Sequence, residues 1–144
     1  MKIVLDMDGT IADLYNVPNW LEYLKNGSPH PYEVAQPMIN IIAFNKWVTN
    51  NNITVVICSW LAKNATADYN KQVRKAKREW LKNCGIVVDK IHIVKYGTPK
   101  HTVTKATKEN QLLFDDDFTV RQKWSKYAPV LSAEHLQAMF PCSL

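Results

Sequence analysis

The sequence predicts an α/β fold: a Rossmann-like parallel β-sheet with helices on both faces, in three layers. Short apolar runs alternate along the chain with longer stretches of helical periodicity. The apolar runs are continuous rather than alternating, which is typical of strands buried on both faces. The chain has 144 residues, of which 47% are hydrophobic. That length favours a single domain over residues 1–144 with a sizeable core.

Five apolar segments are candidate strands. Residues 53–60 are the strongest, because they are β-branched and nearly all apolar. Residues 3–5, 91–94 and 112–114 form shorter runs of the same kind, and residues 129–131 give the weakest signal. Their separation by helical stretches predicts parallel pairing.

Two long stretches between these strands have helical patterns. Pro37 fits the first position of one helix, which Asn50–Asn52 would end. Residues 66–83 form the clearest helix, with Gly85 close after its end. Its apolar side chains share one face: Tyr69, Val73, Ala76 and Trp80.

The remaining helices are shorter. One is expected after Asp117, and another from an N-cap at Ser132 through Met139. Residues 11–36 are too few for an independent domain, so they are expected to form a short flap with one helix over residues 19–26.

The charge of the chain is unevenly distributed. Lys and Arg number 18 against 13 acids, for a net charge of +5, which suits an anionic partner. Five of the acids fall in two tight clusters at Asp6, Asp8 and Asp115–Asp117. Because the rest of the chain is basic, this clustering indicates that the carboxylates have a functional role.

Several protein classes are excluded by what the sequence contains. Its apolar runs are shorter than the roughly 20 residues that cross a bilayer, so no membrane partner is expected. The first residues do not form a signal peptide. Cys58, Cys84 and Cys142 form no CxxC pair, which favours reduced thiols and a cytoplasmic location.

Polar side chains directly follow four of the predicted strands. Asp6 and Asp8 come after the first, Ser59 ends the second, a lysine-bearing turn follows the third, and Asp115–Asp117 follow the fourth. In parallel sheets these positions meet at one edge, where ligands bind. Clustered carboxylates need a cation, and Mg²⁺ prefers oxygen ligands together with a substrate phosphate. The sequence therefore predicts a magnesium-dependent phosphate site.

These motifs resemble those of the haloacid dehalogenase (HAD) superfamily of phosphohydrolases. Residues 6–10, Asp-Met-Asp-Gly-Thr, match its first motif, DxDGT, and Ser59 matches the second. Residues 112–116 match the fourth, a strand that leads to paired Asp residues. The third motif is a single lysine, for which we choose Lys100 over the alternatives Lys95 and Lys105.

The resemblance covers residues 3 to about 120 and implies more than the residues alone. The short chain is similar to deoxyribonucleotidase-like and polynucleotide 3′-phosphatase-like members of small, capless type. The resemblance implies the strand order 5-4-1-2-3. Because residues 11–36 are too few for a cap domain, the site is expected to be open, with little or no cap. The resemblance also implies that Asp6 is a nucleophile forming an aspartyl-phosphate and that Asp8 is a general acid and base.

The ligands of the expected cofactor, Mg²⁺, follow from the same resemblance. Asp6, the backbone carbonyl of Asp8 and Asp116 would hold the ion, with Asp115 as an alternative or outer ligand. The substrate phosphate would be bound by Ser59, Lys100 and Thr10.

The predicted function is hydrolysis of a phosphomonoester, with a nucleotide as the leading substrate. A phosphatase acting on nucleic-acid ends and a catalytically idle phosphate-binding module are the alternatives. The sequence does not predict an oligomeric state. Tyr15, Trp20 and Trp60 lie near the predicted mouth and could stack a base or serve in packing. A basic run reads as the solvated face of a helix, with a nucleic-acid surface as the alternative: Lys71, Arg74, Lys75, Lys77, Arg78 and Lys82.

Overall fold

A five-stranded, wholly parallel sheet forms the centre of the molecule, in the order β3-β2-β1-β4-β5. The structure, a computed structural model, describes residues 1–142. This strand order, read from the other edge, is the predicted 5-4-1-2-3, and the predicted fold class is confirmed. The strands are β1 (Lys2–Leu5), β2 (Thr54–Trp60), β3 (Lys90–Val94), β4 (Gln111–Asp115) and β5 (Val130–Ser132).

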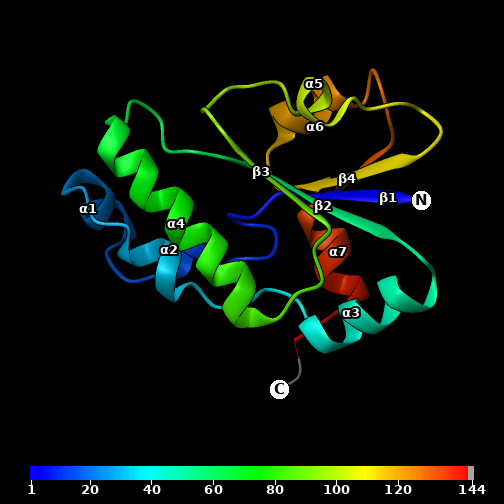
Figure 1. Cartoon of the computed structure of the whole chain (residues 1–144), viewed down its shortest axis with the longest axis horizontal. Coiled ribbons are helices and arrows are strands. Elements are labelled where there is room, and N and C mark those ends of the chain that lie inside the picture. Colours follow the sequence, from blue (N-terminus) through cyan, green and yellow to red (C-terminus); the bar gives the residue numbers. More distant parts are fainter. Residues whose placement is uncertain (143–144) are drawn as a thin grey trace.

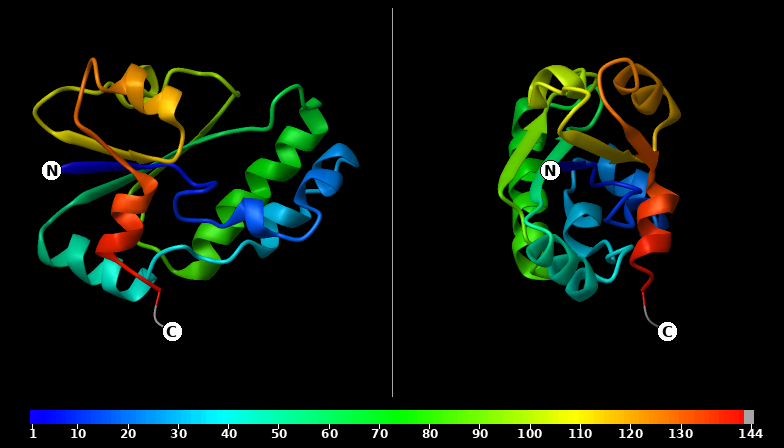
Figure 2. Two further views of the ribbon diagram at one scale, coloured as in Figure 1. Left: turned by 180° about the vertical axis from the view of Figure 1, so that it is seen from behind. Right: turned by 90° about the vertical axis from the view of Figure 1, so that its right-hand side faces the viewer.

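Helices cover both faces of this sheet and make the three predicted layers (Figure 1). In Figure 2 the same layers are visible from behind and from the side. One face carries α3 (Ile41–Asn50), α7 (Ala133–Met139) and the C-terminal half of α4 (Ala67–Cys84). The other face carries α5 (Lys100–Thr104) and α6 (Phe118–Trp124).

The strands are apolar throughout because both faces are buried. In β1, Ile3 and Leu5 pack into the core beneath α3 and α7, whereas Val4 packs into the core beneath α6. Each of these three side chains is fully buried. Continuous burial of this kind fixes the register of β1, whose C-terminal end positions the first acidic cluster.

The helix boundaries follow local capping chemistry. The side chain of Thr66 accepts a hydrogen bond from the backbone N–H of Tyr69 at the start of α4, and Gly85, with φ +76°, ends that helix. The predicted N-caps Asp117 and Ser132 are likewise confirmed at the starts of α6 and α7.

Pro37 is not the first residue of a helix, contrary to the sequence-based prediction. It makes an isolated bridge with Ala12, and α3 begins four residues later after Asn40. The Asn40 side chain accepts a hydrogen bond from the backbone N–H of Ala43, so this cap sets the boundary. The predicted end of the helix at Asn50 is confirmed.

Residues 11–36 contain more helix than expected. They form a 3₁₀ turn (Leu14–Asn16), the predicted helix α1 (Trp20–Lys25) and a further short helix α2 (His30–Val34). Tyr32 of α2 packs in a cluster with Tyr69 and Val73 of α4, so this flap segment rests on α4. Within residues 1–142, no helix is both long and apolar enough to span a membrane.

Candidate active site

Two acidic clusters meet at the C-terminal edge of the sheet because β1 and β4 are neighbours. Leu5 pairs with Phe114, and the backbone N–H of Asp6 donates to the Phe114 carbonyl at 3.0 Å. The chain therefore brings Asp6 against Asp115 and Asp116. One carboxylate oxygen from each of these three residues lies within 4.8 Å of the others.

Gly9 allows the second cluster to approach the first. Its φ of +82° lies in the left-handed region, and a Cβ placed there would collide with the Asp116 carboxylate. Asp116 thus packs directly over the turn of the DxDGT motif. The glycine of that motif is needed for both its backbone conformation and this close approach.

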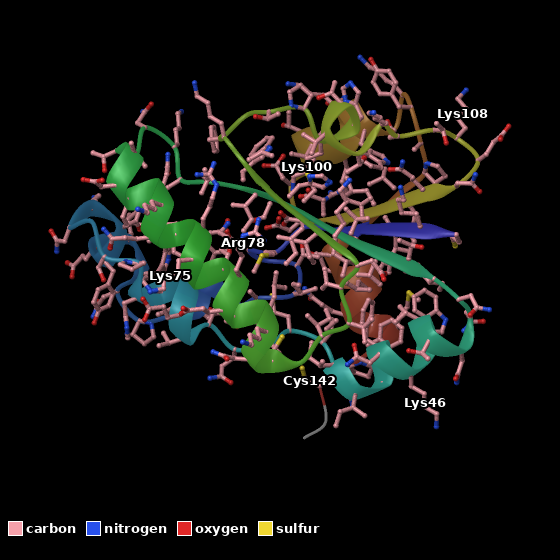
Figure 3. The ribbon with its side chains drawn as sticks, in the orientation of Figure 1. Lys46, Lys75, Arg78, Lys100, Lys108 and Cys142 are labelled. Carbon is pink, nitrogen blue, oxygen red and sulfur yellow. The ribbon has the colours of Figure 1, made fainter. Side chains whose placement is uncertain are left out.

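Lys100 bridges the two clusters from the first position of α5. Its Nζ donates to Asp6 Oδ1 and to Asp115 Oδ2, both at 2.8 Å, and the residue is only 4% exposed. Figure 3 labels Lys100 at the base of α5, beside the strands. The preceding Pro99 favours an extended conformation before it, and Lys100 then starts the short helix. Of the three candidate lysines, Lys100 is the one that contacts Asp6; Lys95 and Lys105 are exposed.

Thr10 holds Asp6 from the other side. Its hydroxyl donates to Asp6 Oδ2 at 3.0 Å, so both oxygens of the carboxylate have a partner. Thr10 is fully buried and does not line the cleft. The Thr10 hydroxyl therefore orients the Asp6 carboxylate, and the contact of Thr10 with a substrate phosphate stays a prediction.

The carboxylate of Asp8 points away from the other acids, toward a second buried lysine. Lys77 Nζ donates to Asp8 Oδ2 at 2.9 Å, to Ser59 Oγ at 2.7 Å and to the Trp60 carbonyl at 2.8 Å. All three protons of the ammonium group therefore have acceptors. Because an ammonium group can only donate, Ser59 Oγ is the acceptor here, and its own hydroxyl proton remains available to a further partner.

The placement of Lys77 corrects the expectation that it lies on a solvated helix face. Its side chain is 1% exposed, whereas the other members of the basic run, such as Lys75 and Arg78 in Figure 3, are exposed. Position 77 follows Val73 by four residues and precedes Trp80 by three, so it falls on the apolar stripe of α4. The spacing of Lys77 from Val73 and Trp80 was the feature of the sequence that could have indicated its burial.

The acids carry more negative charge than the two lysines balance. Burial, the Asp6 charge and a hydrogen bond with Asp6 raise the pKa of Asp116 well above its ordinary value. Burial and the Asp6 charge raise the pKa of Asp115 in the same way, although Lys100 opposes this shift. Burial also raises the pKa of Asp8, against the opposing effect of Lys77. A bound cation would relieve the cost of ionising these groups.

The residues present fit a magnesium ion. Asp6, Asp115 and Asp116 offer hard oxygen donors in one place, and Asp116 is the most open of the three to the cleft. Asp115 already accepts hydrogen bonds from Lys100 and from the backbone N–H of Asp117. Asp6 likewise accepts hydrogen bonds from Lys100 and Thr10, so Asp116 is the carboxylate of the three that is most open to a metal ion.

A cleft of about 350 Å³ opens above these carboxylates. Asp6, Asp8, Asp115 and Asp116 lie at its base together with Lys100. Aromatic side chains also line it: the predicted mouth residues Tyr15, Trp20 and Trp60, together with Tyr32 and Tyr96, which were not predicted there. Tyr15 and Trp20 pack edge to face with ring centroids 5.1 Å apart, so flap packing and cleft lining coincide here.

No protein-family model and no curated protein sequence matches the chain. Solved structures do. A chain in the structure of a Pnkp1/Rnl/Hen1 complex is 14% identical with a TM-score of 0.62, covering 92% of this chain and 45% of that chain. D,D-heptose 1,7-bisphosphate phosphatase from B. bronchiseptica, complexed with magnesium and phosphate, is 14% identical with a TM-score of 0.58, covering 99% and 89%.

A hydrolase from Streptococcus pneumoniae TIGR4 has the same fold, at 11% identity and a TM-score of 0.58, with 96% of both chains covered. The present chain spans less than half of the Pnkp1/Rnl/Hen1 component. At these identities the comparisons establish the fold. They confirm the predicted α/β architecture, a parallel sheet with helices on both sides.

Proposed function

We propose that the protein is a magnesium-dependent phosphatase that hydrolyses a nucleotide phosphomonoester through an aspartyl-phosphate. The observation that carries this proposal is the pair of aspartates held by separate buried lysines: Asp6 by Lys100 and Asp8 by Lys77. Two carboxylates in different environments can take two different roles. The heptose bisphosphate phosphatase, whose fold is similar, was found with magnesium and phosphate, which supports the same chemistry here.

Asp6 is the proposed nucleophile. Lys100 and Thr10 each donate to one of its oxygens, so the carboxylate is fixed in orientation before substrate arrives. Attack of an Asp6 oxygen on phosphorus forms the aspartyl-phosphate and expels the substrate oxygen. The Lys100 ammonium and the Ser59 hydroxyl are proposed to bind the equatorial phosphate oxygens, where negative charge gathers in the transition state.

Asp8 is the proposed general acid and base. Its raised pKa favours the protonated form that can donate to the departing oxygen. Once it has given up that proton, its carboxylate takes a proton from the water that cleaves the aspartyl-phosphate. Lys77 sets the direction of the Asp8 side chain through the 2.9 Å contact.

Asp6, Asp116 and the Asp8 carbonyl are the proposed holders of Mg²⁺, with Asp115 as an outer partner. When bound, the ion supplies positive charge that neutralises the phosphate and lets it approach the carboxylates. The chain itself orients the acids around this position through Gly9, Lys100 and the neighbouring strands β1 and β4.

The proposed substrate is a nucleotide because the cleft combines a charged floor, where a phosphate can bind, with aromatic walls. The end of a nucleic-acid strand is the second candidate. It is favoured by the fold shared with a chain of the Pnkp1/Rnl/Hen1 RNA repair complex and by the net charge of +5.

Phosphate release from a panel of substrates tests this proposal. The panel comprises mononucleotides, sugar phosphates, p-nitrophenyl phosphate and a phosphorylated oligonucleotide, each with Mg²⁺ and with chelator. We expect release that requires the metal and is lost in Asp6→Asn, while the exposed control Asp68→Asn retains it. A folded, Mg²⁺-binding protein that releases no phosphate would instead be a phosphate-binding module.

A further inference from the structure

A second pocket lies beside the phosphate cleft, between α5 and α6, and the proposed reaction does not use it. It has a volume of about 310 Å³. Its apolar lining comes from Val120 and Trp124, which are 7% and 1% exposed. Polar side chains that line it include His101, Thr119 and Lys123. We call it the α5–α6 pocket.

Two aromatic side chains separate this pocket from the cleft. Trp60 and Tyr96 line both cavities, with ring centroids 5.0 Å apart. Trp60 Nε1 donates to the Thr98 carbonyl at 2.8 Å, which fixes the wall to the turn before α5. Lys100, which contacts Asp6, also lines both. A substrate whose phosphate reaches Asp6 can therefore extend into either cavity.

Lysine side chains lie beside the wall formed by Trp60 and Tyr96 and in the α5–α6 pocket. Lys63 Nζ lies 5.8 Å from the centroid of the Tyr96 ring, at the cleft side of the wall. Lys123 lines the α5–α6 pocket. Neither lysine takes part in the ion pairs found among residues 1–142, so both are free to meet a phosphate.

We propose that the α5–α6 pocket binds a second nucleobase, so that the preferred substrate is the phosphorylated end of single-stranded nucleic acid. This inference rests on the phosphatase function proposed above. A mononucleotide has one base, which the aromatic cleft wall of Tyr15, Trp20 and Tyr32 can take. The neighbouring nucleotide then places its base in the α5–α6 pocket and its linking phosphodiester near Lys63.

The chemistry of the pocket matches a nucleobase better than a sugar. Bases stack on aromatic rings largely without regard to sequence, and the wall offers Trp60 and Tyr96. The pocket offers polar side chains that can bind the edges of a base: His101, Thr119 and Lys123. Asp117 is the one carboxylate in its lining. A base held in a duplex cannot enter such a pocket, so the strand end must be unpaired.

Substrate length tests the inference. We would measure kcat/KM for one mononucleotide and for the corresponding dinucleotide and trinucleotide, each with a 3′- or a 5′-terminal phosphate. Occupation of a second base site predicts a gain of about tenfold from mononucleotide to dinucleotide and little further gain for the trinucleotide. The same end held within a duplex should lose that gain.

Filling the pocket gives the matched variant. Thr119→Trp places a large side chain at an exposed position of α6 that lines the α5–α6 pocket. We expect the dinucleotide-to-mononucleotide ratio to fall toward one in this variant. Thr49→Trp, at an exposed position of α3, is the control and should keep the wild-type ratio.

The outcomes separate this inference from the phosphatase proposal. Equal kcat/KM for mononucleotide and dinucleotide would overturn the second base site while leaving the phosphatase intact. If no substrate is hydrolysed, binding of fluorescent mononucleotide and dinucleotide monophosphates to the wild-type protein still decides the matter. A dinucleotide preference that Thr119→Trp removes supports the site, and equal affinities contradict it.

Discussion

Two buried lysines organise the two halves of this site, and they reach it by different routes. Lys100 enters from the first position of the short helix α5 and pairs with Asp6 and Asp115. Lys77 enters from the middle of α4 and pairs with Asp8 while also bonding Ser59. The first holds the proposed nucleophile, and the second holds the proposed acid and base. Strand ends thus supply the carboxylates of the site, whereas helices supply the lysines that pair with them, one at a helix start and one in the middle of a long helix.

The largest expected effect comes from removing the first lysine. In Lys100→Met, Asp6 loses one of its two partners and Asp115 loses its cation. We expect kcat to fall by about 10³-fold, since an electrostatic donor of this kind is worth that order of magnitude. Loss of one partner from a buried ion pair should also reduce the free energy of unfolding by about 3–5 kcal/mol.

Denaturant unfolding and steady-state kinetics measure both effects. Lys95→Met, in the exposed turn that precedes α5, is the matched control and should behave as wild type. If Lys95→Met lost activity and Lys100→Met kept it, the assignment of the third motif would be wrong.

Removal of Lys77 should reduce activity by an amount that depends on the leaving group of the substrate. In Lys77→Met, Asp8 loses the contact that directs it, so protonation of the leaving oxygen suffers. We expect a loss of about 10²-fold with an alkyl phosphate such as a nucleotide, and a smaller loss with p-nitrophenyl phosphate, whose leaving group needs little protonation. A loss that is equal for both substrates would mean that Lys77 serves only the fold.

The same variant has a pH signature. Lys77 lowers the pKa of Asp8, so its removal should raise that pKa further and move the limb of the pH–rate profile that reports Asp8 to higher pH. Lys82→Met, at an exposed position of the same helix, should leave the profile unmoved.

Metal binding gives the smallest of these effects and does not depend on turnover. Mg²⁺ at about 100 times its dissociation constant should stabilise the folded protein by about 2.7 kcal/mol. Asp116→Asn should remove the corresponding rise in Tm, because it takes away the most open carboxylate of the cluster. Asp68→Asn serves as the control. If Mg²⁺ raised the Tm of Asp116→Asn as much as that of the wild type, the ion would have to bind elsewhere.

The sequence predicted the parts of the site that directly follow apolar strands. Asp6, Asp8 and Asp115–Asp116 follow strands whose apolar runs are plain, and parallel pairing then puts them at one edge. Lys77 was missed because its neighbours in sequence are cations, while its position in three dimensions is set by the apolar stripe of α4.

The error in the start of α3 has a physical reason that the sequence pattern does not contain. Pro37 favours a helix start in isolation, but its bridge with Ala12 and the cap at Asn40 move the start of α3. The hydrogen bond from the Thr10 hydroxyl to Asp6 was likewise not predicted, because it depends on the turn around Gly9.

The proposed mechanism requires that Asp6 becomes phosphorylated during turnover. The most direct measurement is mass spectrometry of the protein quenched in acid during steady-state hydrolysis, with Asp8→Asn used to slow breakdown of the intermediate. We predict one added phosphoryl group on the peptide that contains Asp6, present with Mg²⁺ and absent in Asp6→Asn. Continued hydrolysis by Asp6→Asn, with no phosphorylated peptide in any sample, would contradict the mechanism.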